Sequence, residues 1–277
     1  MGNGLRTTLL LAGMTGLLMM VGGLVAGRGG MMGMLVVSAI INFGTFFFAD
    51  SIVLRTTRAV PAPRGELGWL HEMVEELAQR AGIPTPRLYV IPHENSPNAF
   101  ATGRSPERGV VAVTAGLLRA MPPREVRGVL AHEIGHIANR DTLVSAIAAT
   151  MGGVVSMLAY SASWGSVGRR RDNGILVLLV ALLAPLAATV LRMAVSRSRE
   201  YGADAYAAKI SGDPDGLADA LARLGGLVER QPMQNEAARS VHFFVHGFGG
   251  GLAGLFSTHP PIAERVQRLR ARDFSDG

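Results

Sequence analysis

The stretch Ala131-His132-Glu133-Ile134-Gly135-His136 decides how this sequence is interpreted. Its two histidines are four residues apart, so on a helix both imidazoles project from one face and can bind a single zinc ion. Glu133 follows the first histidine and can reach a water molecule on that metal. The pattern predicts a hydrolytic zinc site on a helix that begins near Pro122-Pro123. The alternative is an amphipathic helix whose two histidines have only structural partners.

A hydrolytic zinc site needs a third protein ligand, and the length of the chain segments nominates Glu200. A helix from His136 to Trp164 would rise roughly 42 Å, and one from Gly174 to Glu200 would return roughly 39 Å. An antiparallel hairpin would therefore bring Glu200 level with the histidines. Asp204, one turn later, is placed to accept a hydrogen bond from a ligand histidine and fix its orientation. The competing interpretation of Glu200 is an ion pair with Arg197 or Arg199.

Other candidate ligands are less well placed. His242 and His246 share the four-residue spacing, but they lack an adjacent glutamate and run into a glycine-rich segment. Asp215-Gly216 resembles the aspartate ligand of site-2-type intramembrane zinc proteases, yet it begins a polar helix. His71 and His93 have no partner at ligand spacing, so we expect them at the surface.

The composition is that of a membrane protein. Hydrophobic residues make up 48% of the 277 residues and charged residues 17%, against about 25% charged in soluble domains. The first two apolar runs approach the roughly 20 residues that a bilayer-spanning helix needs, so we expect a transmembrane hairpin at residues 1–60. A cleavable signal peptide is the alternative for the first run. The apolar runs cover residues 7–26, 31–54, 142–164 and 174–191.

The arginines predict the orientation in the membrane. Arg55, Arg58 and Arg64 follow the second run, against the single Arg28 in the hairpin loop, so the positive-inside rule places the following domain in the cytoplasm. The triple arginine at residues 169–171 contradicts a simple four-span arrangement, which leaves open whether residues 142–195 cross the bilayer fully. The net charge of +6 reflects arginines beside apolar runs rather than a stripe interleaved with aromatic residues, so we expect no nucleic-acid partner. The absence of cysteine excludes disulfides and thiolate ligands.

Polar segments between the apolar runs predict a second domain at residues 61–277, with an apolar helical hairpin inserted at 142–195. Apolar residues at helical spacing predict a helix over 69–82, and later helices begin at Pro214 and after Pro261. Strands are expected at residues 87–91, 98–103 and 109–114. The fold class expected is therefore a mainly α membrane protein with a small β-sheet.

The whole chain resembles the HtpX family of bacterial membrane zinc metalloproteases, which are relatives of the CAAX prenyl proteases. The resemblance lies in motifs that follow one another in order along the chain. They are residues 98–103, residues 131–136 continuing to Asn139 and Asp141, residues 198–204, and residues 258–261 with Arg265.

The resemblance implies a zincin-like metalloprotease domain with about four transmembrane or membrane-associated helices. It implies one Zn²⁺ ion per chain, with His132, His136 and Glu200 as ligands and Glu133 as the catalytic carboxylate. Unfolded or damaged membrane proteins would be the substrates, in quality control and stress response at the bacterial inner membrane. The strand that begins at Asn98 would line the substrate cleft.

These expectations combine into one mechanism. Glu133 activates the water, and an extended substrate adds as a strand beside residues 98–103. His259 could stabilise the oxyanion, with Tyr201 a weaker candidate, while Arg265 is expected to brace the last helix. Two other classes stay open, a membrane-bound holdase that keeps zinc for structure and a transporter or scaffold with a fortuitous motif. The oligomeric state is not indicated.

Overall fold

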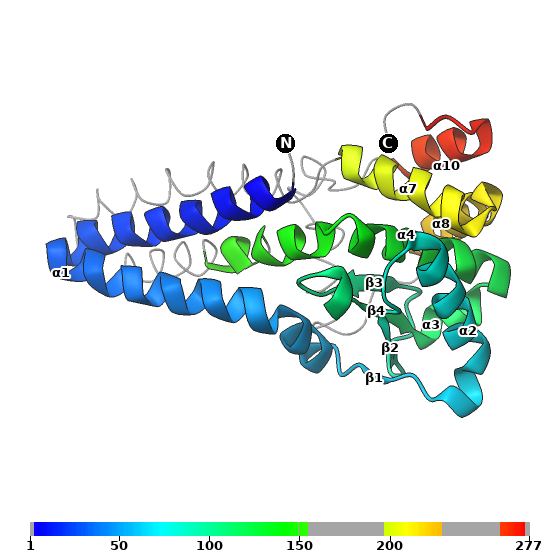
Figure 1. The fold of residues 1–277 in the computed structure, drawn as a ribbon, viewed down its shortest axis with the longest axis horizontal. Coiled ribbons are helices and arrows are strands. Elements are labelled where there is room, and N and C mark those ends of the chain that lie inside the picture. Colours follow the sequence, from blue (N-terminus) through cyan, green and yellow to red (C-terminus); the bar gives the residue numbers. More distant parts are fainter. Residues whose placement is uncertain (1–2, 149, 155–196, 229–260, 275–277) are drawn as a thin grey trace. The chain divides into compact units, whose positions relative to one another are not determined.

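The computed structural model describes residues 3–148, 150–154, 197–228 and 261–274 of the chain (Figure 1). These residues belong to two compact units. One unit comprises residues 1–47 and 144–195, and the other comprises residues 48–143 and 196–277.

The first unit contains most of α1 (Asn3–Thr56), which is a helical hairpin rather than one straight helix. Helical geometry is interrupted at Ala26 and at Gly27, which has φ 59°, a left-handed conformation that suits glycine. The two arms pack closely: a Cβ atom on Gly22 would overlap the backbone of Gly30, and one on Gly30 would overlap the backbone of Gly22. The hairpin predicted from the first two apolar runs is present, and its turn lies slightly before the predicted loop at residues 28–30.

Helix α1 is long and apolar enough to cross a membrane, by length and composition. Its outer surface carries many exposed large apolar side chains, among them Leu24, Val36, Ile40 and Phe43. The third apolar run begins with a shorter apolar helix, Asp141–Val154. The rest of that run, the fourth run and the triple arginine lie outside the described residues.

The second unit is built on a mixed four-stranded sheet with the order β1-β2-β4-β3. Strand β2 (Arg87–Ile91) runs parallel to β4 (Val110–Thr114), and β3 (Ala99–Thr102) is antiparallel to β4. These are the three predicted strands. Strand β1 (Val60–Pro61) was not predicted, because two residues, one of them a proline, carry no alternation pattern. The link between β3 and β4 contains the 3₁₀ turn η1 (Pro106–Arg108).

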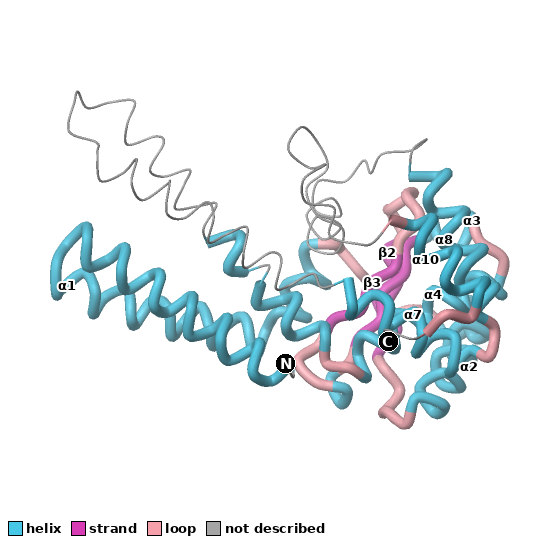
Figure 2. Tube along the Cα trace, turned by 90° about the horizontal axis from the view of Figure 1, so that it is seen from above, coloured by secondary structure: helices cyan, strands magenta, loops and turns pink. Residues whose placement is uncertain are grey.

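Helices cover one face of this sheet (Figure 2). Helix α2 (Arg64–Ala81) ends at the predicted Gly82, which has φ 67°, and begins five residues earlier than predicted. The short α3 (Ala115–Ala120) was not predicted; α4 (Pro123–Ala138) begins at the predicted proline pair. Helices α7 (Arg197–Ser211), α8 (Pro214–Val228) and α10 (Ile262–Ala271) complete the unit.

Helix α4 forms the centre of the core. Its side chains Leu130 and Ile134 are fully buried and belong to the same apolar cluster as Val113 of the sheet, Leu77 of α2 and Leu217 of α8. Because α4 is enclosed by the sheet and by helices on several sides, its polar residues are held in fixed positions within the core.

Candidate metal centre

Two histidines of α4 converge at the centre of the second unit. His132 is buried, with 8% of its surface exposed, and the His132 and His136 Nε2 atoms are 3.1 Å apart. Their rings meet edge to face. This arrangement follows from the four-residue spacing on an α-helix, as the sequence predicted.

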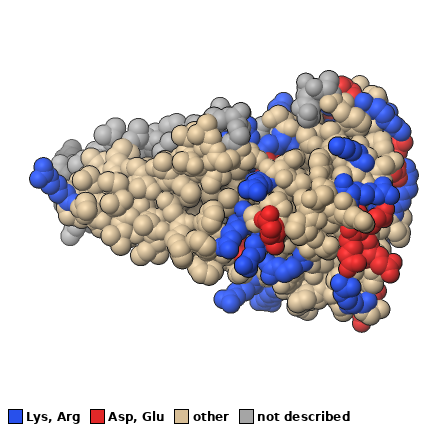
Figure 3. Space-filling view, viewed as in Figure 1, with Lys and Arg blue, Asp and Glu red and all other residues tan. Residues whose placement is uncertain are grey.

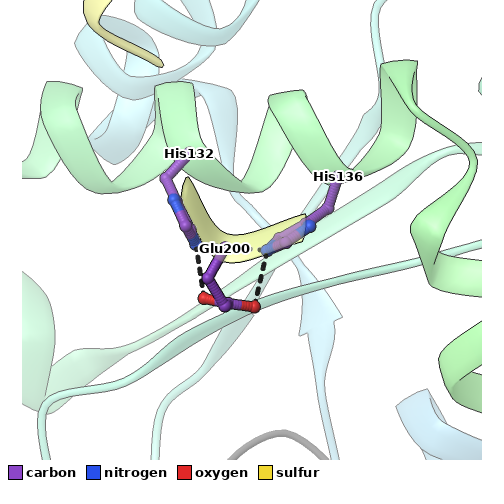
Figure 4. Close-up of side chains that lie close together, drawn as sticks. All are labelled: His132, His136 and Glu200. Atoms are coloured by element: carbon purple, nitrogen blue, oxygen red, sulfur yellow. Dashed lines mark hydrogen bonds and ion pairs between the residues drawn. The ribbon is translucent and has the colours of Figure 1, made fainter. Parts of the chain in front are cut away.

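Helix α7 brings Glu200 to the same place. It packs closely on α4, where Gly135 presents no side chain to Ala203, and a Cβ atom on Gly135 would already touch the Ala203 carbonyl at 3.5 Å. Figure 4 shows the Glu200 carboxylate spanning the two imidazoles, with Oε2 3.6 Å from His132 Nε2 and Oε1 3.6 Å from His136 Nε2. The structure thus places Glu200 beside His132 and His136, as the comparison of the two helix lengths predicted. Among the described residues, this is the group whose ligand atoms could hold a metal ion.

The separations of these ligand atoms fit a zinc ion. Zinc–nitrogen and zinc–oxygen bonds of about 2.0–2.2 Å in a tetrahedron give ligand–ligand distances of about 3.3–3.6 Å. The two imidazole nitrogens are 3.1 Å apart, and each lies 3.6 Å from a different oxygen of the Glu200 carboxylate, which faces both of them. Two imidazole nitrogens and one carboxylate oxygen also form one of the ligand sets of catalytic zinc, which leaves the fourth position open for water.

Asp204 orients the first histidine. His132 Nδ1 lies 3.0 Å from Asp204 Oδ1 and donates a hydrogen bond to it, which turns Nε2 toward Glu200. Burial by itself lowers the pKa of His132, but the hydrogen bonds to Asp204 and Glu200 outweigh it and raise the pKa to about 10. The two carboxylates therefore favour positive charge at this position.

Arg265 of α10 completes this corner of the site. Its guanidinium forms two short hydrogen bonds to Asp204, of 2.6 and 2.8 Å, and lies 3.5 Å from Glu200 Oε2. Only 5% of Arg265 is exposed. The sequence indicated a brace for the last helix; in the structure this arginine also contacts a candidate ligand and the residue that orients another.

Asp141 orients the second histidine, a role that the sequence analysis did not assign. His136 Nδ1 donates to Asp141 Oδ2 at a distance of 3.1 Å. Asn139 caps the end of α4 and Arg140 adopts a left-handed conformation with φ 59°, so the helical path is interrupted and Asp141 lies beside His136. The only signal in the sequence was an aspartate shortly after the second histidine.

Glu133 lies between the metal centre and the sheet. It is 9% exposed, and burial raises the pKa of its carboxyl group above the ordinary value, while the two histidines act in the opposite direction. The backbone N–H of Ala101 in β3 donates a hydrogen bond to this carboxylate. The candidate base thus contacts the strand that the sequence analysis assigned to the substrate.

Strand β3 ends the described sheet, and within that part of the chain no strand pairs with its outer edge. Thr114 N–H donates to the Asn98 carbonyl, so residues at alternate positions from Asn98 pair with β4. Ala99 and Ala101 consequently direct their backbone N–H and C=O groups away from the sheet. These groups can pair with an extended chain.

The remaining predicted site residues have varied positions. Asn98 is buried at the start of β3, and the Tyr201 hydroxyl donates to Glu264 at 2.6 Å. His71 is half-buried beside the Ala62 carbonyl, contrary to the expected surface position, whereas His93 is exposed as predicted. Asp215 is half-buried and forms an ion pair with Arg272 at 2.8 Å. His242, His246 and His259 lie outside the described residues.

Comparison with known proteins gives a consistent picture. Residues 65–273 match the model of Peptidase family M48. The chain is similar to three proteins named "Protease HtpX homolog". The one from Syntrophobacter fumaroxidans is 47% identical, with 98% of this chain and 100% of that protein covered. Those from Persephonella marina and Pyrococcus furiosus are each 48% identical, with 96% and 98% of this chain and 96% of each relative covered.

A solved structure supports the fold independently. The crystal structure of S. mikatae Ste24p superimposes with a TM-score of 0.52 at 21% identity. The match covers 96% of this chain and 62% of that protein.

Proposed function

The chain belongs to peptidase family M48 and is a metallopeptidase; from this premise we propose that it is a zinc-dependent endopeptidase of the membrane. Its proposed substrates are misfolded or damaged membrane proteins, in quality control at the bacterial inner membrane. The observation that carries the proposal is the convergence of His132, His136 and Glu200 beside a buried Glu133. The proposed metal is one Zn²⁺ ion per chain, held by the first three residues.

Bound zinc would supply Lewis-acid chemistry, polarising a peptide carbonyl and making a water molecule more acidic. The protein has to hold the ligands in one orientation. Asp204 and Asp141 do this by accepting the Nδ1 protons of the two histidines, which leaves both Nε2 lone pairs directed at the site.

Glu133 is the proposed general base and acid. Its carboxylate takes a proton from the attacking water as the new C–O bond forms, and it then delivers this proton to the amine nitrogen as the peptide C–N bond breaks. The surrounding core excludes bulk water, and the Ala101 N–H holds the carboxylate in place. Among the described carboxylates beside the two histidines, Glu200 is a proposed ligand, and Asp204 and Asp141 orient the histidines. Glu133 is the remaining carboxylate at the site.

The substrate is proposed to bind as an added strand on β3. The outward N–H and C=O groups of Ala99 and the C=O group of Ala101 pair with its backbone, which delivers a peptide bond next to Glu133. Backbone pairing gives affinity with little sequence preference, which suits an enzyme acting on many damaged proteins. Asn98, Tyr201 and His259 remain proposed contributors to substrate or oxyanion binding.

The membrane location is supported by α1 and by the arginines that follow it. We propose a multi-pass protein with its active site on the cytoplasmic side, in accordance with the positive-inside rule. The apolar residues 142–195 would form the second hairpin.

The test is the Glu133→Gln variant of the full-length protein in detergent, assayed for zinc content and for cleavage of casein or of itself. We expect stoichiometric zinc in both proteins and a loss of at least about 100-fold in cleavage rate, since general acid–base catalysis contributes that much. Glu125→Gln is a matched control on the same helix. Glu125 is buried and holds Arg223 at 2.6 Å, so its loss should lower stability while zinc and cleavage persist.

The outcomes separate the possible functions. A Glu133→Gln protein that binds zinc and cleaves at the wild-type rate contradicts the assigned base. Stoichiometric zinc without cleavage by either protein would indicate a holdase with a structural zinc. No zinc in either the wild type or His132→Ala would indicate a fortuitous motif in a scaffold or transporter.

A further inference from the structure

Several arginines surround one end of the sheet in the second unit. The parallel pair β2 and β4 begins at this end, with Arg87 opposite Val110, and the antiparallel β3 finishes there, with Thr102 also opposite Val110. Arg87 opens β2, while Arg104 and Arg108 lie in the link between β3 and β4. Three strand ends thus bring three arginines together.

The same end of the sheet receives the chain from both apolar segments. Asp50, near the end of α1, forms an ion pair with Arg87 at 2.9 Å. Thr142, in the first turn of the apolar helix, donates a hydrogen bond of 2.7 Å to the carbonyl of Gly103. Both segments by which the chain enters and leaves residues 48–143 of the second unit therefore contact this end of the sheet.

A fourth arginine comes from the turn after α4. Arg140 interacts electrostatically with Glu107 of η1, which places it beside the link between β3 and β4. We call Arg87, Arg104, Arg108 and Arg140 the arginine rim. Three of its members are exposed and Arg104 is half-buried.

The rim has an excess of positive charge. Among the described contacts, Asp50 pairs with Arg87 and Glu107 interacts with Arg140, so these two carboxylates meet a rim of four arginines. Arg55 lies roughly 8 Å beyond Asp50 along α1 and adds to this field. Figure 3 shows basic side chains gathered on this part of the second unit, whereas acidic side chains gather over α2.

We propose that the arginine rim binds the head groups of anionic phospholipids. A guanidinium group matches phosphate with paired hydrogen bonds, and basic residues beside membrane segments are attracted to anionic lipid surfaces. The proposal rests on the proposed membrane location, because it takes the apolar segments to lie in the bilayer. It adds a lipid class and the residues that recognise it.

The rim also has a direct connection to the active site. Ala101, whose N–H contacts Glu133, is one residue before the end of β3, and Arg104 follows that end in the link to β4. Lipid head groups on the rim would thus fix one end of the strand on which the substrate is proposed to bind.

The experiment measures lipid binding by full-length protein in neutral detergent, using fluorescently labelled phosphatidylglycerol and anisotropy as the readout. All proteins carry Glu133→Gln, so that self-cleavage does not interfere and the result does not depend on peptidase activity. Charge neutralisation of one arginine near an anionic surface costs about fivefold in affinity. The double variant Arg104→Gln/Arg108→Gln should therefore bind roughly 25-fold more weakly, and raising the salt concentration should weaken binding by the unmodified rim.

The matched control is Arg119→Gln/Arg270→Gln, which removes the same charge elsewhere. Arg119 follows β4 at the opposite end of the sheet, and Arg270 lies on α10, which packs mainly on α8. We expect its affinity to stay within about twofold of the starting protein. Thermal unfolding and zinc content establish that each variant is folded.

Three results would overturn the proposal: equal losses in the rim and control variants, equal binding of labelled phosphatidylcholine, or displacement of the lipid by inorganic phosphate. The last would indicate a site for small anions. None of these results would affect the peptidase assignment, which depends on Glu133 and zinc.

Discussion

Replacing Asp204 with asparagine should weaken zinc binding and destabilise the metal-free protein by separate routes. Asp204 accepts one hydrogen bond from His132 at 3.0 Å and two from Arg265 at 2.6 and 2.8 Å. Asparagine preserves the shape but removes the charge. A carboxylate that orients a ligand histidine contributes about 10–100-fold to metal affinity, which is about 1.4–2.8 kcal/mol.

The effect on stability comes from Arg265. Removing one partner of a buried ion pair costs about 3–5 kcal/mol, because the other charge stays buried. Glu200 remains 3.5 Å from this guanidinium, so we expect a loss near the lower limit, about 3 kcal/mol. Bound zinc should recover less stability in the variant than in the wild type, since its affinity is lower.

The assay is competition with a chromophoric chelator for zinc affinity, together with thermal unfolding with and without zinc. Asp219→Asn is the control, because Asp219 is an exposed aspartate whose partners Arg124 and Arg270 lie away from the histidines. It should leave the zinc affinity unchanged. If Asp204→Asn loses stability but its zinc affinity stays within about threefold of wild type, Asp204 supports only Arg265 and the orienting role is wrong.

Three further changes test other contacts. Asp141→Asn should weaken zinc binding by about 10-fold in the same competition assay, because it holds His136 at 3.1 Å; an unchanged affinity would contradict this role. Gly128→Ala should cost more than about 3 kcal/mol in chemical unfolding, since its Cβ would lie 2.6 Å from the Leu217 backbone nitrogen; a small loss would mean that α4 and α8 can separate. Gly82→Ala should cost about 1–2 kcal/mol because of its φ of 67°, where an alanine is strained although space is free; an unaltered midpoint would refute this reasoning.

Most of the second unit could be predicted because its elements carry local signals. Short apolar runs bounded by polar or glycine residues predicted β2, β3 and β4, and glycine or proline at helix ends predicted the end of α2 and the starts of α4 and α8. Strand β1 and helix α3 are too short to show a period, and they form because neighbouring elements supply their partners. The order of the strands likewise depends on long-range contacts that a local pattern does not contain.

The residues of the site also fall into two groups, those that a local sequence signal predicts and those that only the folded chain brings together. The spacing of His132 and His136 is a local signal, and Glu200 followed from the lengths of two helices. Arg265 is different, because its place beside Glu200 depends on how α10 packs in the folded chain. Asp141 depends on a left-handed turn at Arg140 that residue type alone did not indicate.

The charges around the metal centre explain why these late additions matter. Four buried carboxyl groups surround the two histidines, and Arg265 is a buried cation among them; the carboxyl groups are those of Glu133, Asp141, Glu200 and Asp204. Buried negative charge without compensation is costly, and a bound cation would offset it. Burial raises the pKa of Glu133, whereas hydrogen bonds to the carboxylates raise the pKa of His132 despite its burial. Arg265 contacts both Asp204 and Glu200, so it offsets part of this negative charge from the protein itself.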